Sequence, residues 1–314
     1  MKTTGSVLEK TKVFNSVLEL IGNTPMVKLN SFKPKKNVDF YAKLELWNPS
    51  GSCKDRIGLH MINEAERKGL LKKGYTIIEA TAGNTGMGVA LAAIGRGYRI
   101  VFVVPTKFSI EKISLMKALG AEIVQTPKEF GMAGANEKVE ELLKTIPNSY
   151  ALKQFENQGN PDAHYLTTGP EIYEEMGGEI DYFIAGAGTG GTYTGIMKYL
   201  KEKNQNIKGV LADPVGSIIG GGNEHAEYEI EGVGNDFIPD TMDISLVDIV
   251  KKITDDESFE LAREITRKEG IICGSSSGAI LAAGLKLSED IDHGNIVLMF
   301  ADRGDRYFSK HLYE

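Results

Sequence analysis

Short apolar runs alternate along the chain with longer stretches in which apolar residues recur at helical spacing. The runs are nearly continuous rather than alternating, which is typical of strands that are covered on both faces. They predict strands over residues 76–80, 99–104, 122–125, 182–185, 207–212 and 296–300. Because a strand–helix–strand order favours parallel sheets with right-handed crossovers, the pattern predicts an α/β fold.

The longer stretches carry helix-stop signals as well as helical spacing. Ile57, Met61 and Ala65 recur every four residues, as on one face of a helix. Ser109 is a good N-cap for the stretch that follows it. The pattern predicts helices over 55–68, 110–119 and 256–268, stopping at Gly69, Gly120 and Gly270. A length of 314 residues favours two domains of about 150 residues each.

The composition is unusual in its glycine content, because 36 of the 314 residues are glycine. That share exceeds the usual value of about 7% and points to tight turns or ligand sites lined by backbone. The net charge of −7 argues against a nucleic-acid partner. No apolar run approaches a membrane span and no signal-peptide core is visible, so we expect a cytoplasmic protein without a membrane partner.

Metal chemistry is not expected either. Cys53 and Cys273 are too few for a zinc cage or a disulfide framework, and their number favours a reducing compartment. The histidines are scattered, without a metal-ligand pair of the HExxH type.

Three predicted strand-to-helix junctions, at 81–86, 186–192 and 273–278, are rich in glycine and hydroxyl residues. Small residues at a helix N-terminus offer free backbone N–H groups, which bind anions. Ligands of open parallel sheets bind at such carboxyl-end junctions. Together the junctions predict a small ligand with several anionic groups. The turn-rich stretch 215–234 reads by default as a surface loop.

The second junction fits a dinucleotide fingerprint. Gly186, Gly188 and Gly191 match G-x-G-x-x-G, and Asp213 closes the next predicted strand. An NAD-dependent oxidoreductase is therefore one hypothesis. The unit lies in mid-chain, however, and the added threonine hydroxyls suit a terminal phosphate better than a pyrophosphate.

The third junction fits a hydrolase motif. Gly274, Ser276 and Gly278 match the nucleophile elbow G-x-S-x-G. A hydrolase would also need an acid and a histidine, for which Asp302 and His311 are candidates. Little chain follows the motif, so a serine-rich helix cap is the favoured interpretation.

Lys54 closes a turn-rich segment and opens a predicted helix. A lysine there is more often a surface residue. Near a phosphate loop, however, the helix dipole and the neighbouring Arg56 would disfavour its ammonium form. Lys54 is therefore a candidate Schiff-base lysine.

These segments resemble a known family, the cysteine synthase and cystathionine β-synthase family of fold type II pyridoxal-phosphate (PLP) enzymes. The matching segments are 21–25, 48–56, 81–86, 154–155, 160–161, 167–171, 188–192, 231–239 and 276–279. The resemblance implies two open twisted α/β domains, like the tryptophan synthase β subunit, with PLP in the cleft between them. It places a smaller, mobile domain at 50–154 and a larger one at 1–49 with 155–314, in a homodimer.

The resemblance also implies roles for individual residues. Lys54 would bind PLP covalently and later remove the α-proton of the substrate. Asn84 would bond the ring hydroxyl, and Ser276 would face the pyridine nitrogen. The PLP phosphate would be held by Gly188, Thr189, Gly190, Gly191 and Thr192. The substrate would be bound by Thr81, Ala82, Gly83, Asn84, Thr85, Gln154 and Gly232.

The implied reaction is β-replacement on O-acetylserine or serine, with sulfide or homocysteine as the nucleophile and cysteine or cystathionine as the product. Residues 81–86, 107–112 and 231–239 most resemble bacterial O-acetylserine-dependent cystathionine β-synthases. Ala82 stands where many cysteine synthases have serine, so Ala82→Ser is expected to change substrate preference. An enzyme that consumes cysteine, releases hydrogen sulfide and forms lanthionine or serine is an open alternative, as is a catalytically silent sensor. The role of Cys53, next to Lys54, stays open.

Overall fold

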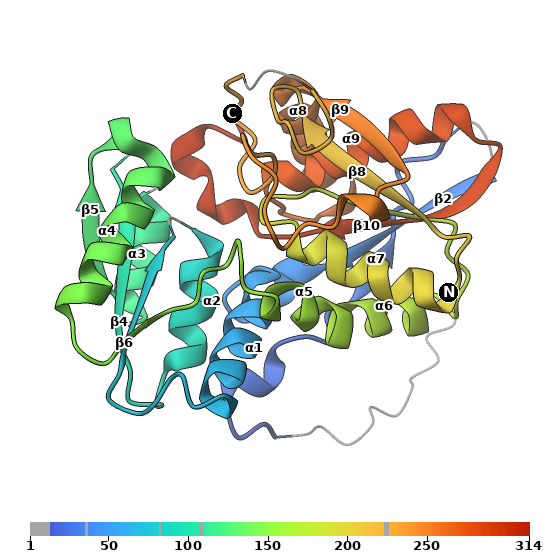
Figure 1. The fold of residues 1–314 in the computed structure, drawn as a ribbon. Helices are drawn as coiled ribbons and strands as arrows, with labels where there is room; N and C mark the ends of the chain where they lie inside the picture. Colours follow the sequence, from blue (N-terminus) through green and yellow to red (C-terminus); the bar gives the residue numbers. More distant parts are fainter. Residues whose placement is uncertain (1–12, 35–36, 82, 107–109, 223–225) are drawn as a thin grey trace.

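The strands of the chain form two separate sheets in the computed structural model, which describes residues 13–34, 37–81, 83–106, 110–222 and 226–314 (Figure 1). One sheet has the order β1 (Met26–Lys28), β2 (Asn37–Leu44), β10 (His293–Phe300), β7 (Tyr182–Ala185), β8 (Lys208–Pro214) and β9 (Ile249–Ile253). The other has the order β5 (Glu122–Thr126), β4 (Arg99–Pro105), β3 (Thr76–Ala80) and β6 (Ser149–Ala151). All neighbours are parallel except β1 and β2, so the predicted α/β fold with parallel sheets is confirmed.

The predicted strands all exist, and those at 76–80 and 182–185 have the predicted bounds. The remaining strands of the sheets, β1, β2, β6 and β9, were not predicted. β1 and β6 are only three residues long, and β2 and β9 interrupt their apolar residues with lysines. Lys43 of β2 is fully buried because its ammonium group is paired with Glu175.

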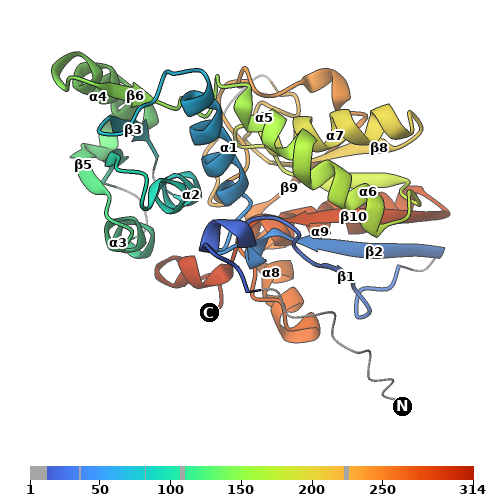
Figure 2. The ribbon, with the colours of Figure 1, turned by 90° about the horizontal axis from the view of Figure 1, so that it is seen from below.

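The four-stranded sheet is covered on both faces. Ile77, Ile100 and Phe102 pack on the side of α1 (Lys54–Arg67), α2 (Asn84–Ala93) and α3 (Ile110–Ala118). Ile78 and Val101, one residue further along each strand, pack against α4 (Gly131–Thr145). Figure 2 shows α3 and α4 on opposite sides of this sheet. Its strands lie within residues 76–151, but the division into domains at 50–154 stays a prediction, and Ala163, beyond that boundary, joins the same core.

The six-stranded sheet carries the larger core. Helix α9 packs on β7, β8, β9 and β10, and α7 packs on β7. The helices of this half are α5 (Gly159–Ala163), α6 (Gly169–Glu175), α7 (Gly191–Lys203), α8 (Asp255–Glu269) and α9 (Ser275–Asp290). A π-helical turn, His164–Thr168, joins α5 to α6, and short 3₁₀ turns lie at Val17–Leu20, Glu45–Trp47, Lys128–Phe130, Ile244–Leu246, Gly304–Arg306 and Phe308–Lys310. Among the described helices, none is long and apolar enough to cross a membrane.

The predicted helices form within a residue of their predicted ends as α1, α3 and α8. Gly69, Gly120 and Gly270 follow them with positive φ angles of 70°, 91° and 72°, the left-handed conformation that ends a helix. The predicted N-cap Ser109 lies outside the described residues.

Helix α1 contacts both halves of the molecule. Its start crosses α2 so closely that a Cβ on Gly88 would lie 2.3 Å from the carbonyl oxygen of Lys54. On its other side, Arg56 pairs with Glu45 and Glu171, with N–O distances of 2.6 and 2.7 Å. The ion pairs and the close helix crossing fix the first turn of α1 next to the start of α2.

Candidate active site

A cavity of about 730 Å³ lies where loops from both sheets meet. Lys54 lines it, together with loop residues that follow β3 and β7. The sequence-predicted residues on its wall are Lys54, Thr81, Gly83, Asn84, Thr85, Gln154, Gly188, Thr189 and Gly232. Gly190, Gly191, Thr192 and Ser276 are not on the wall, and Ala82 lies outside the described residues. The structure thus brings most of the predicted set into one place.

Lys54 is the first residue of α1, as predicted. Its Nζ lies 3.8 Å from Sγ of Cys53, whose thiol has a raised pKa because it is buried. The expected effect of Arg56 on Lys54 loses its basis, because the carboxylates of Glu45 and Glu171 balance the Arg56 charge locally. Lys54 remains at the start of a 14-residue helix, on the wall of the cavity.

Three positions at the junction between β7 and α7 admit only glycine. A Cβ on Gly188 would lie 2.6 Å from the Gly232 carbonyl oxygen, and one on Gly191 would lie 2.1 Å from Oδ1 of Asn160. Gly190 has a φ of +80°. The loop ends at the N-terminus of α7, a 13-residue helix, where backbone N–H groups and the helix dipole favour a phosphate.

Buried polar side chains hold this loop from behind. Thr189 Oγ1 accepts a hydrogen bond of 2.9 Å from Nδ2 of Asn160. Thr192 Oγ1 lies 3.0 Å from Nε2 of His164, whose Nδ1 is 2.9 Å from the hydroxyl of Thr168. Burial, followed by the charge of Lys54, lowers the pKa of His164 well below its ordinary value. His164 was missed in the sequence because a single histidine among scattered ones carries no pattern.

In the segment after β3, polar side chains line the cavity, and hydrogen bonds to distant residues orient them. Thr85 Oγ1 donates a 2.7 Å hydrogen bond to Oε1 of Gln154. Asn84 donates from Nδ2 to Asp302 at 2.7 Å and accepts from Nη1 of Arg306 at 2.6 Å. Asn84, predicted to bond the PLP ring hydroxyl, is therefore already oriented by two residues more than 200 positions away in the chain.

Lys112, Glu231 and Tyr307 also line the cavity and were not predicted. Lys112 Nζ lies 2.5 Å from Oε2 of Glu231 and 4.2 Å from the centre of the Tyr307 ring. Tyr307 Oη donates to Oδ2 of Asp302 at 2.5 Å, and burial raises its pKa well above the ordinary value. This group joins the small-sheet side of the cavity to the C-terminal segment.

The structure argues against two rival interpretations, the NAD-dependent oxidoreductase and the hydrolase. Asp213 is fully buried and bonds Lys252 at 2.5 Å, so it is not free for a ribose as a dinucleotide enzyme requires. His311 is exposed and pairs with Glu314, so no triad forms with Ser276 and Asp302.

The surface-loop interpretation of 215–234 is wrong for its second half, because 227–234 line the cavity. In the described part of the chain no group of side chains could hold a metal ion.

One cavity thus brings together a lysine, a glycine loop that ends at a helix N-terminus and a hydroxyl-rich loop, an arrangement that suits a phosphorylated cofactor able to react with an amine. The chain belongs to the family of pyridoxal-phosphate-dependent enzymes, whose model matches residues 17–302. PLP is its cofactor, and the residues fit it, because Lys54 lines the same cavity as Gly188 and Thr189 at the glycine loop.

Individual relatives are similar over nearly the whole chain. An O-acetylserine-dependent cystathionine β-synthase of Bacillus subtilis is 49% identical, over 96% of this chain and 98% of that protein. A cysteine synthase of Helicobacter pylori strain J99 is 45% identical, over 96% and 99%. The crystal structure of a hydrogen sulfide-producing enzyme from Fusobacterium nucleatum superposes with a TM-score of 0.91 at 43% identity, covering 94% of this chain and 100% of that one.

Proposed function

We propose that this enzyme catalyses β-replacement on O-acetylserine or serine, and that it adds sulfide or homocysteine to give cysteine or cystathionine. The observation that carries the proposal is the shared cavity of Lys54, the glycine loop and the hydroxyl-rich 81–86 loop. Two similar proteins, a cystathionine β-synthase that depends on O-acetylserine and a cysteine synthase, support the same chemistry.

Lys54 is the catalytic residue in this proposal. Bound PLP supplies an electron sink for the charge that develops at the substrate Cα. Lys54 lies on the cavity wall. Its Nζ takes the α-proton while the β-substituent leaves, and it returns the proton to Cα when the sulfur nucleophile adds at Cβ. A general base must lie within reach of the proton that it takes, and the place of Lys54 on the cavity wall meets that requirement.

The two loops divide the binding work. Gly188, Thr189 and the N-terminus of α7 bind the phosphate through N–H groups and a hydroxyl, with Gly190, Gly191 and Thr192 completing the loop. Thr81, Gly83, Thr85 and Gln154 bind the substrate carboxylate, with Gly232 opposite them. Asn84 orients the ring, and Ser276, a neutral hydroxyl at the start of α9, faces the pyridine nitrogen. This arrangement chiefly positions the reacting atoms.

The test compares Lys54→Ala with the wild type and with Lys68→Ala, an exposed lysine at the other end of the same helix. After addition of PLP, the wild type and Lys68→Ala should show the visible absorption band of a lysine-bound cofactor and turn over O-acetylserine. Lys54→Ala should lose both. A wild type that stays colourless with PLP would overturn the proposal.

A second candidate reaction begins with cysteine and releases hydrogen sulfide, with lanthionine or serine as the other product. The similar enzyme of Fusobacterium nucleatum, which produces hydrogen sulfide, favours keeping it. Product analysis with O-acetylserine, serine or cysteine, each paired with sulfide or homocysteine, separates the two. Turnover of cysteine alone, with none from O-acetylserine, would make the second candidate the function.

Three finer features belong to the same proposal. We infer a homodimer in the cytoplasm, with the 50–154 region closing on the substrate carboxylate. The two cysteine thiols, Cys53 and Cys273, are both unpaired and buried, which suits a reducing compartment. Sedimentation equilibrium tests the dimer, and cell fractionation tests the location.

A further inference from the structure

The turn that carries Gln154 has an unfavourable backbone conformation. Lys153, directly before it, has a φ of +54°. This left-handed region is uncommon for residues other than glycine, and such residues persist only where surrounding contacts hold them. Gln154 and Phe155 follow immediately and line the active-site cavity. A backbone strain next to a substrate-binding residue therefore calls for a contact that maintains it.

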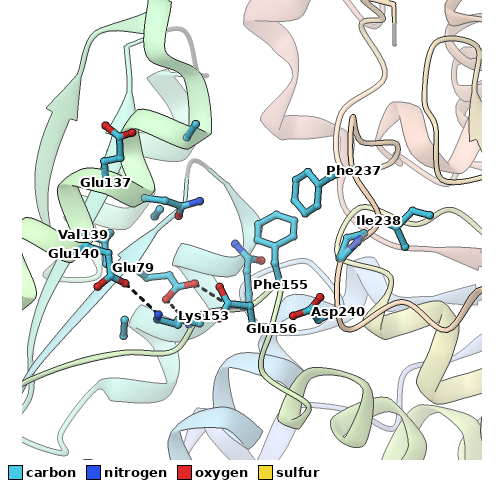
Figure 3. A pocket seen from close by; sticks show the side chains of 16 residues that line it. Glu79, Glu137, Val139, Glu140, Lys153, Phe155, Glu156, Phe237, Ile238 and Asp240 are labelled. Atoms are coloured by element: carbon cyan, nitrogen blue, oxygen red, sulfur yellow. Dashed lines mark hydrogen bonds and ion pairs between the residues drawn. The ribbon is translucent and has the colours of Figure 1, made fainter. Parts of the chain in front are cut away.

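The contact is a carboxylate. Glu79 lies on β3, and its side chain is only 4% exposed. Its Oε2 accepts a hydrogen bond of 2.9 Å from the backbone N–H of Lys153, and its Oε1 accepts one of 3.1 Å from the N–H of Gln154. Figure 3 shows the Glu79 side chain pointing at this turn from the neighbouring strand. Each carboxylate oxygen thus accepts from one N–H of the turn, that of the strained Lys153 and that of Gln154.

The rest of Gln154 is held from two further directions. Its side-chain Oε1 accepts from the Thr85 hydroxyl at 2.7 Å, and its backbone carbonyl accepts from Nδ2 of Asn160 at 2.9 Å. The same Asn160 amide group bonds Thr189 of the glycine loop. We call the two hydrogen bonds from Glu79 to the turn the Glu79 clamp. The clamp begins a chain of contacts that reaches from the four-stranded sheet to the phosphate-binding loop.

We propose that Glu79 is a positioning residue for the β-replacement reaction, which holds the 153–154 turn so that the Gln154 amide meets the substrate carboxylate. The inference rests on the proposed function, because it takes Gln154 as a substrate-binding residue. Glu79 acts through the backbone of the turn and does not itself touch the reacting atoms. Its loss should weaken binding of the first substrate more than it slows the chemical step.

Several charged residues surround the Glu79 clamp, and the protonation state of Glu79 determines the pH at which the variants should be compared. Glu79 lines a second hollow, of about 540 Å³, with Glu137, Glu140, Lys153, Glu156 and Asp240 (Figure 3). Lys153 pairs with Glu140 at 3.1 Å, and Tyr150, whose pKa is raised by burial and by Glu79, lies on β6. Burial raises the pKa of Glu79 itself to about 7. The comparison of variants should therefore be made at about pH 8.5, where Glu79 is ionised.

The test is Glu79→Gln, in which an NH₂ group replaces one acceptor and opposes an N–H of the turn. The KM for O-acetylserine should rise about tenfold, with kcat within about twofold, since one strong hydrogen bond is lost. Asp248→Asn is the matched control: Asp248 accepts from the Gly209 N–H at 2.7 Å, and it does not line the cavity. It should leave the KM unchanged.

The rescue makes the test specific. In a Lys153→Gly background the turn no longer needs a clamp, because glycine adopts positive φ freely. Glu79→Gln should then raise the KM by no more than about twofold relative to Lys153→Gly alone. An equal increase in both backgrounds, no increase in either, or a similar increase for Asp248→Asn would overturn the proposal.

Amide hydrogen exchange provides a readout that needs no substrate. Glu79→Gln should speed exchange of the Lys153 and Gln154 amides at least about tenfold, while Asp248→Asn leaves them unchanged. Unchanged exchange in Glu79→Gln overturns the proposal even if the enzyme is active. If the wild type fails to use O-acetylserine, the proposed function fails by itself, and the exchange result still decides whether Glu79 holds the turn.

Discussion

The loop after β7 and the loop after β3 occupy equivalent places, each at the carboxyl end of a parallel strand and each leading into a helix. Their first glycines are packed differently. In the first, Gly188 and Gly191 leave no room for a Cβ, because neighbouring backbone and Asn160 touch them. In the second, a Cβ on Gly83 would meet only Lys112, at an ordinary contact distance of 3.7 Å, and close packing begins further on, at Gly86 in α2, where a Cβ would lie 2.4 Å from Sδ of Met116.

The difference shows two ways to build an anion site. The β7 loop depends on absent side chains at Gly188 and Gly191, and buried hydrogen bonds to Thr189 and Thr192 hold it as well. The β3 loop presents the side chains of Asn84 and Thr85, which are oriented by Asp302, Arg306 and Gln154. Substitutions near the first loop should therefore affect binding of the cofactor phosphate, and those near the second should affect the substrate and, through Asn84, the cofactor ring.

The largest expected effect is on Gly191→Ala. Its Cβ would lie 2.1 Å from Asn160 Oδ1, a buried atom, so the loop or Asn160 must move. Overpacking of this kind costs about 1–3 kcal/mol, and we expect PLP to bind about 10- to 100-fold more weakly. Titration of the apoenzyme with PLP, followed by absorbance, measures the change.

Gly83→Ala is the counterpart in the other loop. It should change the affinity for PLP by less than about threefold, because its new methyl group makes only ordinary contacts. Equal losses of PLP affinity in the two variants would show that the contrast between packed backbone and oriented side chains is not real.

The second expected effect is a pH dependence of stability that arises on the β3 side of the cavity. Burial raises the pKa of Glu79, which supports the β3 side, from 4.5 to about 7. A raised carboxyl pKa adds stability that is present below about pH 4.5 and is lost as the pH rises through about 7. Between about pH 4 and pH 8.5, the free energy of unfolding of the wild type should therefore fall by up to about 3 kcal/mol relative to that of Glu79→Gln.

Thermal unfolding of both apoenzymes across this range checks the sign. The Tm difference, variant minus wild type, should grow as the pH rises. If it shrinks or stays constant, Glu79 does not titrate with a raised pKa in the folded protein.

The smallest effect is expected for Tyr307→Phe, which removes one of the two hydrogen bonds that Asp302 Oδ2 accepts and leaves that from Asn84. A net loss of about 1 kcal/mol in binding free energy should raise the KM for O-acetylserine about fivefold, with a smaller loss of PLP affinity because Asn84 also orients the cofactor ring. Tyr313→Phe, which removes a bond to the Cys273 carbonyl outside the cavity, is the control. A change in PLP affinity without a change in KM would contradict the division of labour.

Sequence patterns predicted those parts of the site that local physics determines. Lys54 was identified from its place at a helix start, and the glycine loop from its place after an apolar strand. Residues whose roles depend on distant partners were not found. Asp302, considered only as the acid of a hydrolase, reaches Asn84 through the fold, and His164 carries no local pattern. Glu79 is one charged residue in a strand of uncharged ones, and nothing in the sequence marks its contact with the 153–154 turn. The residue-by-residue roles of the site stay predictions until variants are measured.

The ion pairs of Arg56 bear on how the chain can be divided. Arg56 sits two residues after Lys54, and its carboxylate partners, Glu45 and Glu171, both lie outside residues 50–154. A fragment cut at those positions would carry a guanidinium without its partners, a loss that costs about 3–5 kcal/mol where the charge is buried. Split-protein designs and domain exchanges among relatives should therefore transfer Glu45, Arg56 and Glu171 as one inseparable unit.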